Sequence, residues 1–154
     1  CRLENIEHKI RRLIRYYDQM VGTRDPMSIA RYLNIGIAIV PLGEIAGNYK
    51  LLKRKRWIFV NEDIPAESTL FRIVVAHELG HAILHRKENC AFIKSKTLLL
   101  TSGIEREANR FAAYLLITDE MLKEYAGYTE DQFCACTGYP KELISLRLKP
   151  PLAF

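Results

Sequence analysis

Two histidines and a glutamate stand at a spacing that suits a metal-dependent hydrolase. The segment His77-Glu78-Leu79-Gly80-His81 is an H-E-x-x-H motif. Residues four apart on an α-helix lie one turn apart on the same face, so His77 and His81 can present two imidazoles to one metal ion. Glu78 lies about 100° around the helix from His77, within reach of a water on that metal. The pattern therefore predicts a zinc site with Glu78 as the general base.

The surroundings of the motif predict that its helix is buried. Apart from the motif's polar residues, this helix is apolar nearly all round: Ile73, Val74, Val75, Ala76, Leu79, Ala82, Ile83 and Leu84. A helix that is apolar all round belongs in a protein core, where histidine and glutamate side chains need polar partners. Ligation of a metal satisfies His77 and His81 together. We therefore prefer a metal site to the alternative, a chance match on a solvated helix face.

A catalytic zinc normally takes a third protein ligand, for which His85, Glu105 and Glu107 are candidates. His85 lies about 12 Å along the helix from His77, so we expect a structural role for it at the helix end. Glu105 falls in the middle of a small, apolar stripe of a following helix, formed by Ala108, Ala112, Leu115 and Leu116. Glu107 falls on the far edge of that stripe. Because the stripe should pack on the motif helix, we expect Glu105 to be the third ligand and Glu107, the alternative, to point outward.

Asn109 follows Glu105 by one helical turn. Its amide could bind the second ring nitrogen of a ligand histidine, as the outer partners of metal-binding histidines do. Ordinary polarity of the helix face is the alternative, and both hypotheses stay open at this point.

Apolar spacing and turn residues predict the elements that must position these side chains. Before the motif we expect, in order, a helix over 3–20, a short helix ending near Leu33, a strand over 37–40, a turn at Gly47-Asn48, and a hairpin with strands 49–52 and 57–61 around the basic tip 53–56. The motif helix should run from about Pro65 to His85. A connection over 87–102 should follow, and its run 97–100 could be a strand, a helical turn or a lip that faces the substrate. Helices should then contain Glu105–Leu116, 120–125, 129–136 and 142–148.

Composition predicts a globular protein. The chain has 154 residues, of which 49% are hydrophobic and 27% charged, and this suits one domain with a real core. We expect no signal peptide, and no apolar run approaches the roughly 20 residues of a membrane helix. Four cysteines without a C-x-x-C pair (Cys1, Cys90, Cys134 and Cys136) predict reduced thiols and a cytoplasmic location. We interpret the net charge of +5 as solvated surface in preference to a nucleic-acid or acidic-partner site.

Two segments together resemble the ImmA/IrrE family of metallopeptidases. They are His77-Glu-Leu-Gly-His-Ala-Ile-Leu-His85 and Glu105-Arg-Glu-Ala-Asn-Arg-Phe-Ala-Ala-Tyr-Leu-Leu116. The family pairs H-E-x-x-H with a following helix of the form E-x-x-A-N/D-x-F-A. Ser28–Ile37 and Trp57–Asn61 are similar to its N-terminal half. The family often continues with Leu-Leu-Met-Pro, whereas Ile117-Thr118 follow here, so the next loop departs from the pattern.

The resemblance implies a gluzincin-like site with one Zn²⁺ per chain, held by His77, His81 and Glu105, and Glu78 as general base. It implies a cytoplasmic peptidase that cleaves a helix-turn-helix repressor in a bacterial, phage or mobile-element switch. With the expected elements, it predicts an α+β fold: a small, mainly antiparallel sheet packed on a zincin-type helical core. We expect a single metallopeptidase domain over 1–154, in which 129–148 form a helix-turn-helix-like C-terminal subdomain. Direct DNA binding by this tail is a weaker expectation.

A rival function belongs to another class. The basic segment and the helical tail also suit a metal-containing regulatory or sensor protein that binds a repressor or DNA with little proteolysis. Glu78 discriminates between the two, because Glu78→Gln should abolish cleavage and keep zinc in a peptidase but leave a sensor working.

Overall fold

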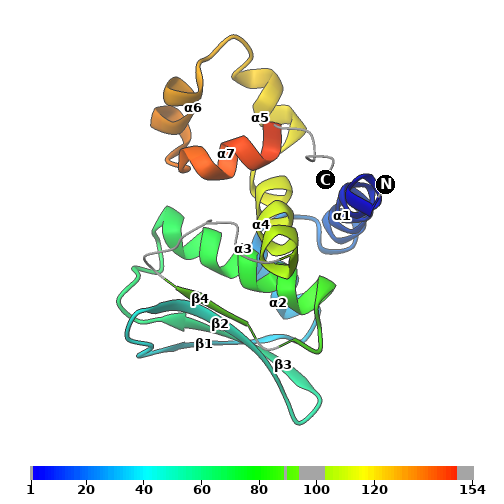
Figure 1. Cartoon of the computed structure of the whole chain (residues 1–154), viewed down its shortest axis with the longest axis vertical. Coiled ribbons are helices and arrows are strands. Elements are labelled where there is room, and N and C mark those ends of the chain that lie inside the picture. The colour runs from blue at the N-terminus through cyan, green and yellow to red at the C-terminus, as the bar shows by residue number, and fades with distance from the viewer. Residues whose placement is uncertain (1, 89, 94–102, 149–154) are drawn as a thin grey trace.

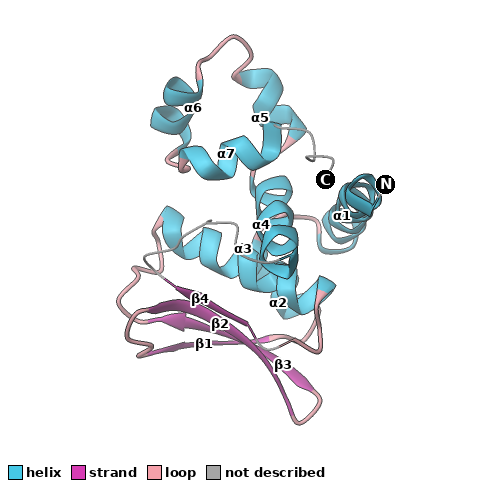
Figure 2. Cartoon of the chain, in the orientation of Figure 1, coloured by secondary structure: helices cyan, strands magenta, loops and turns pink. Residues whose placement is uncertain are grey.

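The computed structural model describes residues 2–88, 90–93 and 103–148, which form seven helices and four strands. In chain order they are α1 (Arg2–Val21), α2 (Pro26–Tyr32), β1 (Gly36–Val40), β2 (Ile45–Leu52), β3 (Lys55–Asn61), α3 (Thr69–Leu84), β4 (Cys90–Ile93), α4 (Gly103–Leu116), α5 (Asp119–Glu124), α6 (Glu130–Thr137) and α7 (Lys141–Leu148). The strands form one layer and the helices lie on one side of it (Figures 1 and 2). The predicted α+β class is confirmed.

The described strands form one sheet in the order β1-β3-β2-β4. Strand β2 is antiparallel to β3 and β4, whereas β1 runs parallel to β3, so the prediction of a mainly antiparallel sheet is confirmed. The expected hairpin joins β2 to β3 through Lys53 and Arg54, whose φ angles are 49° and 67°. Positive φ at both central residues is the type I′ geometry, which matches the twist of the flanking strands.

Two expectations about this sheet are wrong. Gly47-Asn48 is not a turn, because both residues lie inside β2, where Gly47 pairs with Val60 of β3 and Phe92 of β4. The expected connection after the motif helix contains strand β4, although its run 97–100 lies outside the described residues. Pairing with β3 and β4 overrides the local turn propensity of Gly47-Asn48, and pairing with β2 makes part of the connection a strand.

Helix α3 packs on the inner face of β2 and β3 and carries the H-E-x-x-H motif. It begins at Thr69 rather than near Pro65, because the Ser68 hydroxyl accepts the Phe71 N–H at 3.1 Å and caps the helix there. Every residue from Ile73 to Ala82 is buried, as the apolar surroundings of the motif predicted. The motif therefore lies in the core between the sheet and α4 (Figure 1).

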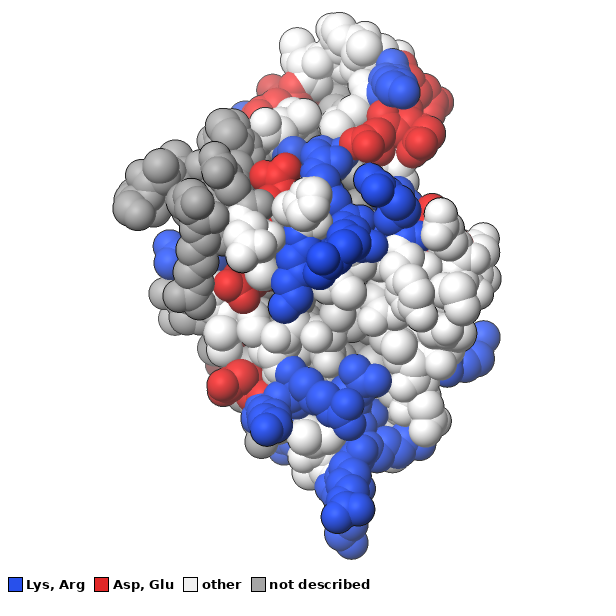
Figure 3. Space-filling view, turned by 90° about the vertical axis from the view of Figure 1, so that its right-hand side faces the viewer, with Lys and Arg blue, Asp and Glu red and all other residues white. Residues whose placement is uncertain are grey.

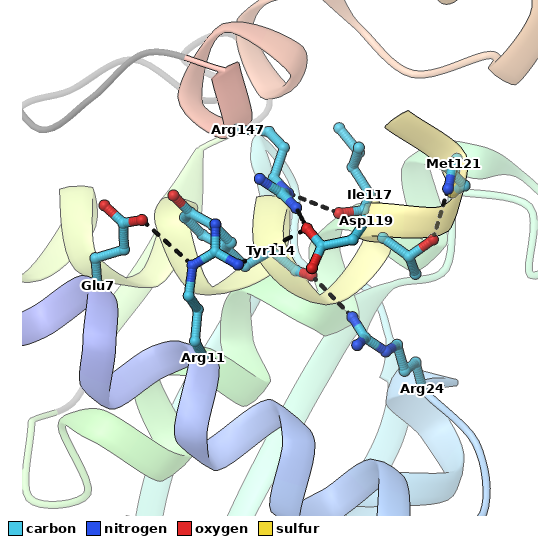
Figure 4. Close-up of polar contacts among 9 residues, drawn as sticks. Glu7, Arg11, Arg24, Tyr114, Ile117, Asp119, Met121 and Arg147 are labelled. Carbon is cyan, nitrogen blue, oxygen red and sulfur yellow. Dashed lines mark hydrogen bonds and ion pairs between the residues drawn. The ribbon is translucent and has the colours of Figure 1, made fainter. Parts of the chain in front are cut away.

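The C-terminal helices join the rest of the chain through α7, which packs on α4. The buried guanidinium of Arg147 donates from Nε to the Ile117 carbonyl at 2.8 Å and also pairs with Asp119 (Figure 4). Arg11 of α1 lies 3.7 Å from the same carboxylate. One aspartate thus connects α1, α5 and α7.

Cys134 and Cys136 carry free thiols; Cys1 and the side chain of Cys90 lie outside the described part. Among the helices that the structure describes, none combines the length and the apolar character needed to cross a bilayer.

Candidate metal centre

Helices α3 and α4 lie in close contact at Gly80, inside the motif. A Cβ added to Gly80 would lie only 3.2 Å from the Cα and carbonyl oxygen of Ala108 and from the Cβ of Phe111. Ala108 and Ala112 are fully buried, as expected for a stripe that faces the motif helix. Small residues on both helices therefore bring the backbones close enough for a short Glu105 side chain to reach the two histidines.

The structure brings His77, His81 and Glu105 together. Nε2 of His77 lies 3.0 Å from Oε2 of Glu105, and Nε2 of His81 lies 3.1 Å from Oε1 of the same carboxylate. The two Nε2 atoms are 3.1 Å apart. Both histidines are fully buried, and Glu105 is about one-fifth exposed. Three ligand atoms thus converge on one point.

This donor set fits a zinc ion. Ligand atoms about 2.0–2.1 Å from a tetrahedral zinc lie about 3.3 Å from one another, close to the separations between the three residues. A metal ion between them would also satisfy the two ring nitrogens, which face each other, and the carboxylate. Two imidazoles and one carboxylate form a set that catalytic zinc uses, with a position left open.

Electrostatics favour the metal-binding forms of Glu105 and His81. Burial alone would raise the pKa of Glu105, but its close contacts with the rings of His77 and His81 lower it to about 2. Burial lowers the pKa of His81, against the opposing effect of Glu105. A carboxylate and a neutral imidazole are the protonation states that coordinate a cation.

The outer partners of the two histidines differ. Nδ1 of His77 lies 2.7 Å from Oδ1 of Asn109, the contact that the sequence left open. Nδ1 of His81 lies 3.1 Å from Nδ1 of His85, whose Nε2 is 2.6 Å from Oε2 of Glu107. The expectation that Glu107 points outward is therefore wrong. Helices α3 and α4 pack so closely that the edge of the stripe still reaches the last turn of α3.

Glu78 lies beside His77, His81 and Glu105, and its carboxylate makes no hydrogen bond within the described part of the chain. The side chain is fully buried, and neither carboxylate oxygen has a hydrogen-bond partner among the described residues. Burial raises its pKa well above the usual value, and the charge of Glu105 raises it further. A buried carboxyl without a partner is costly, so a function must retain it.

Gly47 supports Glu78 from the sheet, a role that the sequence did not reveal. A Cβ on Gly47 would lie 2.4 Å from Cγ1 of Val74 and 3.3 Å from Cγ of Glu78. Only glycine fits there, and its absent side chain makes room for the carboxylate. An isolated glycine within a strand can mark such a close approach, but the neighbouring Asn48 favoured a turn.

Comparisons with known proteins show the family of this chain. Residues 30–149 match the Peptidase_M78 family model, described as an IrrE N-terminal-like domain. The chain is 37% identical over 145 residues to uncharacterized immunity region protein 2 of Bacillus phage phi105, covering 92% of this chain and 88% of that protein. It is 27% identical over 151 residues to metallopeptidase ImmA of Bacillus subtilis strain 168, covering 94% and 85%. The resemblance seen in the two helical segments is thereby confirmed, and the chain belongs to the ImmA/IrrE family of metallopeptidase-like proteins.

Proposed function

We propose that this protein is a zinc-dependent endopeptidase that cleaves a transcriptional repressor. The observation that carries the proposal is the convergence of His77, His81 and Glu105 within 4.8 Å, beside the buried carboxylate of Glu78. One relative is named a metallopeptidase and another an immunity region protein of a phage. A repressor is the partner that suits a phage immunity switch, and it would place the protein in the bacterial cytoplasm.

In this proposal His77, His81 and Glu105 hold the zinc. When bound to such a set, zinc supplies a Lewis acid for the scissile carbonyl and makes water a better nucleophile near neutral pH. Glu78 acts as the general base and acid: an oxygen of its carboxylate takes a proton from water and delivers it to the leaving amine. Both oxygens are available for this transfer because no described residue donates a hydrogen bond to them. Asn109 holds the His77 ring by accepting its Nδ1 proton.

The sheet offers a place for an extended substrate. Strand β4 is an edge strand of the sheet and contacts α3. A peptide can add to such an edge through main-chain hydrogen bonds. We therefore propose that the substrate lies along β4, which would hold its main chain beside the metal helix.

Metal content and cleavage test this function together. The parent should retain one zinc per chain, and Glu105→Ala should lose it. Incubation with a helix-turn-helix repressor from the same genome should produce new termini with the parent but not with Glu78→Gln, which keeps the zinc. Glu62→Gln, at an exposed glutamate before α3, is the matched control and should cleave normally. Cleavage that survives Glu78→Gln would contradict the proposal.

The basic surface favours a second candidate, a regulator that binds DNA. Lys and Arg gather over the middle and lower parts of the face in Figure 3, below an acidic region. Arg11, Arg15, Arg24 and Arg147 line one pocket on the molecule, together with Asp119, which pairs with Arg11 and Arg147. Fluorescence anisotropy with duplex DNA over a salt series would support this candidate if affinity fell steeply with salt and Glu78→Gln changed neither binding nor regulation.

A further inference from the structure

His85 and Glu107 are the one histidine and the one carboxylate of the two motif segments that the proposed reaction does not use. They nevertheless form a hydrogen-bonded chain to a ligand histidine: His81 Nδ1 to His85 Nδ1 at 3.1 Å, and His85 Nε2 to Glu107 Oε2 at 2.6 Å. The side chains of His85 and Glu107 are 8% and 21% exposed. The chain is therefore largely sheltered from water and joins α3 to α4.

The contacts in this chain favour the His81 tautomer that zinc requires. An ionised carboxylate only accepts hydrogen bonds, so a neutral His85 that donates from Nε2 to Glu107 has Nδ1 open as an acceptor. Nδ1 of His85 can then accept a hydrogen bond from a protonated Nδ1 of His81. Zinc ligation through Nε2 of His81 needs the same tautomer, because a coordinating imidazole nitrogen carries no proton. The opposite tautomer would place the ring proton on Nε2, on the side where His77 and Glu105 lie.

We propose that His85 and Glu107 are positioning residues for His81. Through His85, the carboxylate of Glu107 fixes the His81 tautomer in which Nε2 is free to bind zinc, and holds the ring toward Glu105. The proposal rests on the metal site of the proposed function but not on peptidase turnover. The other ligand, His77, has a simpler support, the neutral amide of Asn109 at 2.7 Å. A charged acceptor increases the basicity of the histidine that it supports.

Zinc affinity measures this role without any substrate. Competition with a chromophoric chelator should show a loss of about 10–100-fold for Glu107→Gln and for His85→Gln, the cost typical of an outer partner of a metal ligand. Glu107→Gln keeps the shape of the side chain and removes its charge, so the fold should persist. His8→Gln and Glu124→Gln, at exposed positions on α1 and α5, are the matched controls and should bind zinc like the parent.

A double mutant and a spectrum separate positioning from a merely structural role. Because Glu107 acts through His85, His85→Gln with Glu107→Gln should lose no more zinc affinity than His85→Gln alone. Long-range ¹H–¹⁵N spectra of the zinc-free parent should show the His81 proton on Nδ1, and zinc-free Glu107→Gln should populate both tautomers. Additive losses, or a folded Glu107→Gln that keeps the parent affinity and tautomer, would overturn the proposal.

The same measurements distinguish this proposal from the peptidase proposal. A parent that binds zinc but cleaves nothing would refute the peptidase and leave the positioning role standing. A parent that cleaves, with a Glu107→Gln variant of unchanged zinc affinity, would refute the positioning role alone. A parent that binds no zinc would refute both.

Discussion

Replacing Gly80 with alanine should weaken zinc binding more than it weakens the fold. The new methyl group would lie 3.2 Å from three atoms of α4, and two of them, the Cα and carbonyl oxygen of Ala108, belong to the backbone. A side-chain rotation cannot relieve these contacts, so α4 itself must move away by a few tenths of an ångström. Glu105 lies one turn before Ala108 on that helix and moves with it.

The effect on stability can be bounded. Alanine in a helix interior gains about 1 kcal/mol over glycine, whereas overpacking a core costs about 1–3 kcal/mol. The net loss for the zinc-free protein is therefore about 0–2 kcal/mol, or at most about 8 °C in Tm for a chain of this size. A metal site tolerates shifts of only about 0.2 Å, so we expect zinc affinity to fall about 10-fold or more, as when a ligand loses its support.

Urea unfolding in the presence of a chelator measures the stability of the zinc-free protein, and zinc competition measures the zinc affinity. Gly103→Ala is the matched control, because its methyl group would meet no atom of the described chain within 4 Å. It should leave zinc affinity unchanged. A Gly80→Ala variant that gained the full helix-propensity increment and bound zinc like the parent would refute the close approach of α3 and α4.

Three further predictions concern the sheet, the C-terminal helices and the metal. Gly47→Ala should cost about 1–3 kcal/mol in urea unfolding and abolish repressor cleavage, because its Cβ would collide with Val74 and press on Glu78; unchanged cleavage would contradict this packing. Burial alone would raise the pKa of Asp119, but Arg147 holds that pKa below its usual value. The ionised Asp119 therefore stabilises the fold at pH values above its unfolded pKa, about 4. This contribution is lost as the pH falls through the folded pKa. Asp119→Asn should therefore be less stable than the parent near neutrality and nearly equal to it at low pH; a constant difference would contradict the pairing. Removing zinc with a chelator should lower the free energy of unfolding by about 4 kcal/mol where free zinc had been about 1,000 times Kd. Thermal scans at two zinc concentrations test this, and a Tm that did not rise with zinc would contradict it.

Helical periodicity predicted much of this site because both ligand-bearing segments are helices. A period of 3.6 residues places His77 and His81 on one face and Glu105 within an inward stripe, and the structure brings these three side chains together. Strand pairing has no such local signal, since it depends on distant partners. For that reason Gly47 was interpreted as part of a turn, and β4 was missed within a connection.

The contact between His85 and Glu107 could not be predicted from helical periodicity alone. Angles around one helix axis ranked Glu107 as outward, but whether a side chain points to water depends on the distance to the next helix. That distance is set at Gly80 and Ala108, where the absence of side-chain bulk lets α3 and α4 touch. Once the helices touch, His85 at the end of α3 lies within 2.6 Å of Glu107. The close contact at the glycine of H-E-x-x-H therefore lets Glu105 lie against His77 and His81, and Glu107 against His85. If so, Gly80→Ala should disturb the His81 tautomer as well as zinc affinity, and the ¹H–¹⁵N spectra that test Glu107→Gln would detect it.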